Sequence, residues 1–261
     1  MPETQVNITT VSTVLNMEQQ EQETPWYEQW FDENYLALYR HRDRGDAEEQ
    51  VRLIIDTLGL SPDTAILDLA CGEGRYTALF NELGYTITGL DLSETLIECG
   101  RERYTGLDLR VGDMRRIPGT FDLILSLFTS FGYFDADQEN EKVLHSVYNA
   151  LNPGGVFWLD FLNAQQVQEQ LAPRSASQLT PEIQALETRK IENGRIIKDI
   201  YFKDDDREKC YRESVRLFTR QQLEDMFQRT GFHILKLFGD YKGQPWAPLS
   251  PRTILVGRKT A

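Results

Sequence analysis

The sequence predicts an α/β fold in which helices cover both faces of a parallel sheet. Between residues 64 and 162, short apolar segments typical of strands alternate with longer amphipathic segments. The first strand passes into its helix through Cys71-Gly72-Glu73-Gly74, a turn with two glycines. Strands that alternate with helices form βαβ units, and consecutive units build a parallel sheet.

Residues that commonly start or end helices and strands bound the elements of this sheet. Ser93 is a helix N-cap before an amphipathic run. The turn Asn152-Pro153-Gly154-Gly155 separates a helix from the next strand. The predicted strands are 64–70, 86–91, 107–113, 121–128 and 156–162, and the predicted helices are 74–84, 93–104 and 137–151.

The N-terminal part predicts a tail followed by a helical cap. Residues 1–24 are rich in Gln, Glu and Thr, a composition typical of disorder, so the folded domain is expected over 25–261. The aromatic residues between Trp26 and Tyr39 indicate one helix. Residues 47–60 indicate a second, amphipathic helix that is ended by Gly59 and the following Ser-Pro pair.

After residue 162 the pattern changes to that of an antiparallel addition. Period-2 segments flank Asn193-Gly194, a strong hairpin signal, and 210–218 indicates a third strand. An added sheet is therefore expected at about 183–218. Thr219 and Gln222 form a capping box for the next helix, and the strands 233–240 and 252–259 then pair as an antiparallel edge.

Composition excludes several classes of partner. The net charge of −13 and the pI near 4.8 argue against nucleic acid, because phosphate backbones are bound mainly by Lys and Arg. No apolar run reaches the roughly 18 residues of a membrane span, and the N-terminus does not resemble a secretory signal. Three cysteines without metal-type spacing indicate reduced thiols, no metal site and a cytoplasmic protein.

The carboxyl ends of the strands predict a site for an adenosine-containing cofactor, because ligands of parallel sheets gather there. Glycines after the first strand permit close approach of backbone to a ligand. Asp91 ends the second strand and can accept both hydroxyls of a ribose, and Asp113 ends the third and can accept an adenine amino group. Thr77 stands where a dinucleotide loop has its third glycine, which disfavours an NAD(P)-dependent enzyme.

Five motifs together resemble class I S-adenosylmethionine-dependent methyltransferases that act on small molecules, such as sugar-amine and glycine N-methyltransferases. The motifs are DLACGEGR, TGLDLS, GDMRRIP, FDLILSLFTSFGYF and LNPGGVFWLDF, and the resemblance extends over residues 26–259. It implies a Rossmann-like seven-stranded sheet of order 3-2-1-4-5-7-6 with strand seven antiparallel. It also implies an N-terminal helical cap, a small added sheet, and S-adenosylmethionine as cofactor with S-adenosylhomocysteine as product.

The resemblance also implies roles for individual residues. The methionine and ribose parts of the cofactor would lie against Ala70, Cys71, Gly72 and Gly74, and Arg75 would either bind the cofactor carboxylate or cap the turn. Asp91 would hold the ribose. The remaining contacts would come from Leu92, Asp113 and Met114 at the adenine, and from Leu127 and Phe128 at the sulfonium and amino-acid end.

Candidates for the acceptor side come from the cap and the later segments. Tyr35 and Tyr39 share a helix face; Tyr39 is expected over the methionine moiety and Tyr35 at the acceptor, with core packing as the alternative for both. His41 and Tyr133 are the candidate catalytic groups. Arg212 and Arg252 are candidates for an anionic acceptor, because guanidinium pairs with carboxylate.

The predicted function is methyl transfer from S-adenosylmethionine to a nitrogen or oxygen atom of a small molecule. The alternatives are a non-catalytic cofactor-binding protein and cyclopropane-type modification of a lipid. The expected partner is a small-molecule acceptor, without nucleic acid or membrane, and the sequence leaves monomer and homodimer open.

Overall fold

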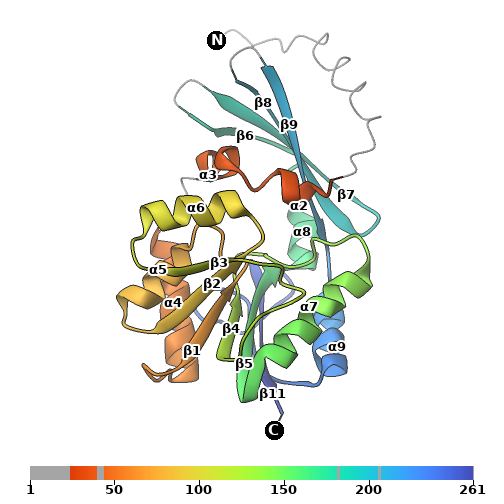
Figure 1. Cartoon of the computed structure of the whole chain (residues 1–261). Coiled ribbons are helices and arrows are strands. Elements are labelled where there is room, and N and C mark those ends of the chain that lie inside the picture. Colours follow the sequence, from red (N-terminus) through yellow and green to blue (C-terminus); the bar gives the residue numbers. More distant parts are fainter. Residues whose placement is uncertain (1–23, 40–43, 181–182, 205–206, 261) are drawn as a thin grey trace.

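The computed structural model describes residues 24–39, 44–180, 183–204 and 207–260 (Figure 1). The predicted disordered tail, apart from Thr24, and the candidate His41 lie outside the described residues.

The described residues contain a large sheet of order β10-β11-β5-β4-β1-β2-β3. Neighbours from β5 to β3 pair in parallel, and β11 is antiparallel to both β5 and β10. Counted within this sheet, the order is 3-2-1-4-5-7-6 with strand seven antiparallel, which confirms the prediction. The strands are β1 (Ala65–Leu69), β2 (Thr86–Asp91), β3 (Asp108–Val111), β4 (Phe121–Ser126), β5 (Leu151–Leu162), β10 (Phe232–Phe238) and β11 (Arg252–Lys259).

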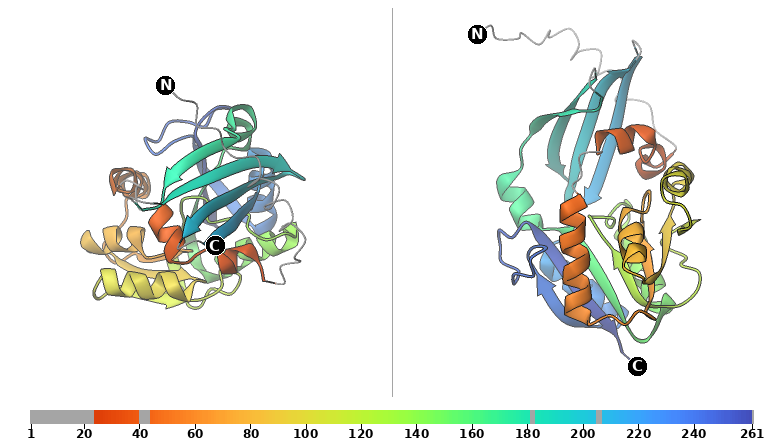
Figure 2. Two further views of the ribbon diagram at one scale, coloured as in Figure 1. Left: turned by 90° about the horizontal axis from the view of Figure 1, so that it is seen from above. Right: turned by 90° about the vertical axis from the view of Figure 1, so that its left-hand side faces the viewer.

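Helices pack on both faces of this sheet because adjacent strand residues point to opposite faces. One apolar cluster joins α4 (Arg44–Leu58) and α5 (Arg75–Glu82) to Ile66 and Trp158. The other joins α7 (Asp137–Ala150) and α9 (Arg220–Thr230) to Leu67 and Phe157, and α6 (Glu94–Arg103) contacts β2 and β3. Figure 2 shows α4 alongside the sheet. None of the described helices is long and apolar enough to cross a membrane.

A second, antiparallel sheet extends beyond one end of the large sheet (Figures 1 and 2). Its order is β6-β7-β8-β9, with β6 (Arg174–Gln178), β7 (Gln184–Glu192), β8 (Arg195–Asp204) and β9 (Arg207–Arg216). Asn193 and Gly194 have φ of 49° and 71°, the left-handed pair that a tight hairpin requires. The sequence did not predict β6, whose Arg-Ser-Ala-Ser-Gln lacks the β-branched and aromatic residues that indicate strands, or α8 (Ala164–Gln170).

The cap consists of two short helices, so the prediction of one continuous helix is wrong. α2 covers Trp26–Gln29 and α3 covers Glu33–Leu38. The carboxylate of Asp32 accepts hydrogen bonds from the backbone N–H groups of Asn34 and Tyr35, which makes Asp32 an N-cap and starts a new helix. The cap packs on the second sheet through an apolar cluster that includes Trp30 and Ile200.

Close packing of α6 against the glycine turn generates a stability prediction. A Cβ at Gly100 would lie 2.4 Å from the carbonyl oxygen of Glu73, which is backbone and cannot move cheaply. Gly100→Ala should therefore lower the free energy of unfolding by about 1–3 kcal/mol, although alanine favours helices by about 1 kcal/mol. Urea unfolding measures this. Glu98→Ala, on the exposed side of α6, is the matched control and should not destabilise; an equally stable Gly100→Ala would contradict the packing argument.

Candidate functional site

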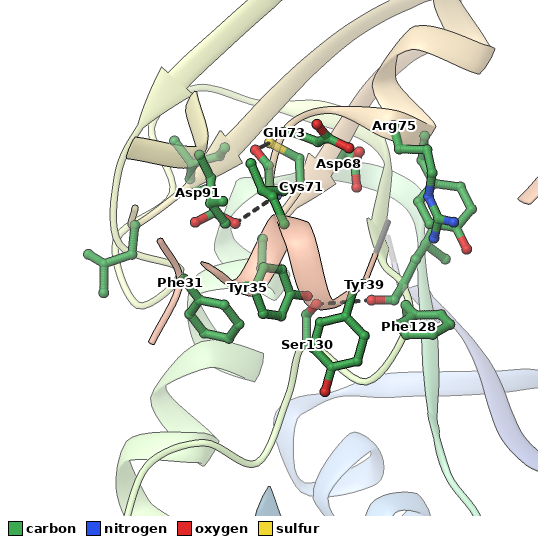
Figure 3. A pocket seen from close by; sticks show the side chains of 18 of the residues that line it. Phe31, Tyr35, Tyr39, Asp68, Cys71, Glu73, Arg75, Asp91, Phe128 and Ser130 are labelled. Carbon is green, nitrogen blue, oxygen red and sulfur yellow. Dashed lines mark hydrogen bonds between the residues drawn. The ribbon is translucent and has the colours of Figure 1, made fainter. Parts of the chain in front are cut away.

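A pocket of about 480 Å³ lies at the carboxyl ends of β1, β2, β3 and β4. The cap helices contribute its other wall, so the pocket lies between the large sheet and the N-terminal residues. Figure 3 shows Asp91, Cys71 and Asp68 on one side, with Phe31 and Tyr35 of the cap facing them. Of the predicted site residues, those that line it are Tyr35, Tyr39, Ala70, Cys71, Gly72, Arg75, Asp91, Leu92, Asp113, Met114, Leu127, Phe128 and Tyr133.

The glycine turn presents backbone to this pocket. Ala70 and Cys71 both donate their N–H groups to the carbonyl of Leu90, at 2.7 and 3.1 Å, which ties the turn to β2. Gly72 has φ of 59° and lines the pocket. Gly74 does not line it; instead a Cβ there would lie 2.8 Å from Leu109, so this glycine permits the turn to pack on β3.

Asp91 lies at the junction of the turn and α6. Its two carboxylate oxygens accept the N–H groups of Gly72 at 2.8 Å and Ser93 at 2.9 Å. Burial raises its pKa, against the lowering effect of these hydrogen bonds. A carboxylate has about four acceptor positions, so capacity for further donors from the pocket remains.

Asp68 is a second buried carboxylate in the lining. It is 1% exposed, and one oxygen accepts both the backbone N–H of Thr77 at 3.1 Å and its hydroxyl at 2.8 Å. These bonds hold the first turn of α5 against β1. Burial raises the pKa of Asp68 to about 6, which the Thr77 hydrogen bonds only partly oppose.

Asp113, at the end of β3, is already engaged by a neighbour. Arg115 donates Nε to both carboxylate oxygens at 3.0 Å and Nη2 to one of them at 2.6 Å. Burial raises the pKa of Asp113, but the hydrogen bonds and charge of Arg115 outweigh it and leave the pKa below its ordinary value. Asp113 is therefore ionised at neutral pH, and its orientation is fixed by Arg115.

The cap side of the pocket is connected to the second sheet by charges that the sequence did not predict. Tyr39 donates its hydroxyl to Glu213 at 2.7 Å and accepts from Lys198. Lys198 and Glu213 are direct cross-strand partners, and Lys198 also lies 3.4 Å from Glu187. No local motif marks these residues, because only the register of β7, β8 and β9 brings them together.

Aromatic rings line the same side. The Tyr133 ring lies 4.9 Å from that of Trp26 and 5.8 Å from that of Phe31, centroid to centroid. At the other end, the guanidinium of Arg75 lies 5.7 Å from the centre of the Phe128 ring.

Two predicted substrate residues lie outside the pocket lining. Arg212 pairs with Asp199 at 2.7 Å, and strand alternation puts it on the face opposite to Glu213. Arg252 pairs with Asp160 at 2.7 Å, with only 14% of its side chain exposed. An anion-binding role for either arginine stays a prediction, as does the role of His41. Within the described ranges, no group of three His, Cys, Asp or Glu residues could hold a metal ion.

The strand order, the antiparallel seventh strand and the pocket at the strand ends define the class I S-adenosylmethionine-dependent methyltransferase fold. Residues 66–155 match a family described as a methyltransferase domain. The chain therefore resembles the class I methyltransferases and, among them, the sugar-amine N-methyltransferases, as its motifs predicted.

Individual relatives are consistent with this class. The chain is 35% identical over 125 residues to dTDP-3-amino-3,4,6-trideoxy-alpha-D-glucopyranose N,N-dimethyltransferase of Streptomyces venezuelae, covering 47% of this chain and 53% of that protein. It is 34% identical over 110 residues to glycine/sarcosine N-methyltransferase of Halorhodospira halochloris, covering 38% and 40%. The chain therefore spans about half or less of the length of these curated relatives.

Solved structures show the same fold over most of the chain. An S-adenosylmethionine-dependent methyltransferase from Clostridium acetobutylicum matches with a TM-score of 0.75 and 21% identity, covering 87% of this chain and 96% of that one. The sugar N-methyltransferase KedS8 from Streptoalloteichus matches with a TM-score of 0.71 and 20% identity, covering 87% and 93%.

The raised pKa of Asp68 generates a pH prediction. In the folded state the Asp68 carboxyl stays protonated up to about pH 6, whereas in the unfolded chain it loses its proton near its ordinary pKa of 3.8. Protonated Asp68 therefore contributes fully to the stability of the fold below about pH 4, and this contribution is lost as the pH rises through 6. Asp68→Asn keeps an acceptor for Thr77 but cannot titrate. The free energy of unfolding of the wild type, minus that of the variant, should fall by about 2–3 kcal/mol between about pH 4 and 7. Urea unfolding at several pH values measures this difference; a constant or rising difference would contradict it.

Proposed function

We propose that the protein transfers the methyl group of S-adenosylmethionine to a nitrogen atom of a small-molecule acceptor. The observation that carries the proposal is one pocket that holds the glycine turn, Asp91 and Asp113 on one side and aromatic cap residues on the other. Its volume of about 480 Å³ suits a small organic cofactor. The family match at residues 66–155 supports the same reaction class.

Each part of the cofactor has a proposed partner in this chain. Asp91 would accept the ribose hydroxyls with the capacity left by Gly72 and Ser93. Asp113 and Met114 would receive the adenine, and the backbone from Ala70 to Gly72 the methionine part. The remaining proposed contacts are Tyr39, Gly74 (through packing of the turn), Arg75, Leu92, Leu127 and Phe128.

Positioning would be the main work of the protein residues. The bound sulfonium supplies an activated methyl group, and transfer requires the acceptor atom in line with it, with reacting atoms about 3–3.5 Å apart. Phe31, Tyr35 and Tyr133 line the pocket and would hold the acceptor and exclude water. Tyr133 and His41 stay the candidates for receiving a proton.

A nitrogen acceptor is favoured over an oxygen acceptor by two observations. The pocket lining holds more acidic than basic side chains, with Glu33, Asp68, Glu73, Asp91 and Asp113 against Arg75 and Arg103, which suits an amine that arrives as a cation. Relatives of the chain are also named as N-methyltransferases of amino sugars and glycine.

Free cysteines at 71, 99 and 210 support a reducing, cytoplasmic setting. Light scattering on the purified protein distinguishes monomer from homodimer.

Cofactor binding tests the first half of the proposal. Isothermal titration with S-adenosylhomocysteine should show micromolar binding by the wild type, and Asp91→Ala should weaken it by at least about tenfold, because hydrogen bonds to a charged group contribute about 1.5–3 kcal/mol. Asp108→Asn removes a carboxylate that lies outside the pocket lining and pairs with Arg110, so it should bind like the wild type. Absence of binding by the wild type would overturn the cofactor assignment.

Methyl transfer tests the second half. The wild type, incubated with methyl-labelled S-adenosylmethionine, should label amino sugars or amino acids but not the matched hydroxy compounds. Label in the hydroxy compounds alone would replace the nitrogen acceptor by oxygen. Cofactor binding without label in any acceptor would favour a non-catalytic cofactor-binding protein. Label in vesicle lipids would favour the lipid-modifying alternative.

A further inference from the structure

The carboxylate of Asp160, on β5, is the meeting point of four different segments. Asp160 is 0% exposed. One oxygen accepts from the backbone N–H of Phe128 at 2.9 Å, from Gln50 Nε2 at 3.0 Å and from the Tyr241 hydroxyl at 3.0 Å. The other accepts from Nε of Arg252 at 2.7 Å. The donors belong to the turn after β4, to α4, to the loop before β11 and to β11 itself.

The turn that Asp160 holds has a costly backbone conformation. Phe128 and Thr129 are consecutive non-glycine residues with φ of 56° and 69°. This conformation is costly for residues that carry a side chain, and it persists only where surrounding contacts hold it. The turn also bonds to Asp160 through its backbone, because Thr129 donates its N–H to the Asp160 carbonyl at 3.1 Å.

Arg252 also binds the turn and so connects it to Asp160 a second time. Its Nη2 donates to the Thr129 hydroxyl at 2.8 Å while its Nε binds Asp160. Asp160 also balances this buried positive charge, since both side chains are almost fully enclosed. Only a carboxylate has the acceptor positions for all four donors.

The turn is also a wall of the pocket. Leu127, Phe128 and Ser130 line it, and Phe128 is 37% exposed. Glycine at position 128 would relieve the strain but would remove the ring from the pocket. The strained backbone therefore places these side chains at the pocket. Asp160, which is outside the pocket lining, offsets the strain through its hydrogen bonds to the turn.

We propose that Asp160 is a positioning residue for methyl transfer, whose buried carboxylate holds the Leu127–Ser130 turn in the left-handed conformation that the pocket requires. This inference rests on the proposed function. Asp160 does not line the pocket, so it acts through the turn and through Arg252. It should therefore affect the rate of transfer far more than the affinity for the adenosine part of the cofactor, which the proposed function assigns to Asp91 and Asp113.

Asp160→Asn tests the proposal with three measurements. In this variant an amide N–H₂ group, which is a donor, replaces one of the two oxygens that accept hydrogen bonds from the surrounding donors. The turn should then lose support, and the backbone NMR shifts of Phe128 and Thr129 should move away from the values typical of left-handed residues. With the acceptor found for the wild type, kcat should fall by about 10–100-fold, as expected for a small misplacement of a wall of the site. The dissociation constant for S-adenosylhomocysteine should stay within about threefold, since the proposed hydrogen bonds to the adenosine come from Asp91 and Asp113 and not from this turn.

A rescue separates positioning from general stability. Thr129→Gly added to Asp160→Asn relieves the strain of the left-handed conformation. It also removes the hydroxyl that Arg252 binds, but Asp160→Asn already weakens that contact because it takes away the carboxylate that holds Arg252, so the relief of strain should dominate and restore part of kcat. If Asp160 only stabilises the fold by pairing with Arg252, Thr129→Gly should not restore kcat. Asp122→Asn, at the opposite end of β4, is the matched control and should keep the wild-type kcat; Asp122 bonds to Ala65 and Asn152 there.

The outcomes separate this proposal from the proposed function. If the wild type transfers methyl groups and Asp160→Asn keeps both its kcat and the NMR shifts of the turn, the positioning role is overturned. If the wild type neither binds nor turns over the cofactor, the proposed function fails, while the NMR shifts still report whether Asp160 holds the turn. If Asp160→Asn does not fold, Thr129→Val removes only the Arg252 contact; it should lower kcat at unchanged affinity, and an unchanged kcat would overturn the proposal.

Discussion

The hydrogen bond between Gly72 and Asp91 is the interaction on which the candidate site depends. It joins the turn after β1 to the end of β2 across the parallel sheet, at 2.8 Å. The same carboxylate receives the N–H of Ser93 and so also fixes the start of α6. One side chain thereby sets the distance between glycine backbone and acidic group, which is the distance that a ribose-containing ligand would have to match.

Buried carboxylates organise the rest of the site in the same manner. Asp68 fixes the start of α5 through Thr77, and Asp160 fixes the turn after β4 through Phe128. Each takes backbone N–H groups that would otherwise lack partners, at the ends of strands where the sheet ladder stops. The three positions lie on β1, β2 and β5, so carboxylates from three strands contribute to holding the turns at the carboxyl edge of the sheet.

The cap and the second sheet form the other half of the pocket by a different kind of contact. Aromatic rings from 26–39 pack against Tyr133 and Tyr211, and a polar row through Tyr39, Lys198 and Glu213 crosses the apolar face of the second sheet. Burial lowers the pKa of Lys198, although the neighbouring Glu213 and Glu187 oppose this effect. Such specific polar partners define the position of the cap on the second sheet, which a purely apolar surface would not do.

The sequence by itself determined the βαβ core, the strand order implied by its motifs, the hairpin at Asn193-Gly194 and the residues around Gly72 and Asp91 that line the pocket. Those features depend on short-range signals: apolar periodicity, glycine at a turn, and acids at strand ends. Only the tertiary structure decided the break in the cap at Asp32, the strand β6, and the partners of Asp160 and Lys198. Asp160 meets Gln50, Tyr241 and Arg252 because α4, a loop and β11 converge there. Contacts between segments so distant in the chain follow from packing and strand register, and no local pattern encodes them.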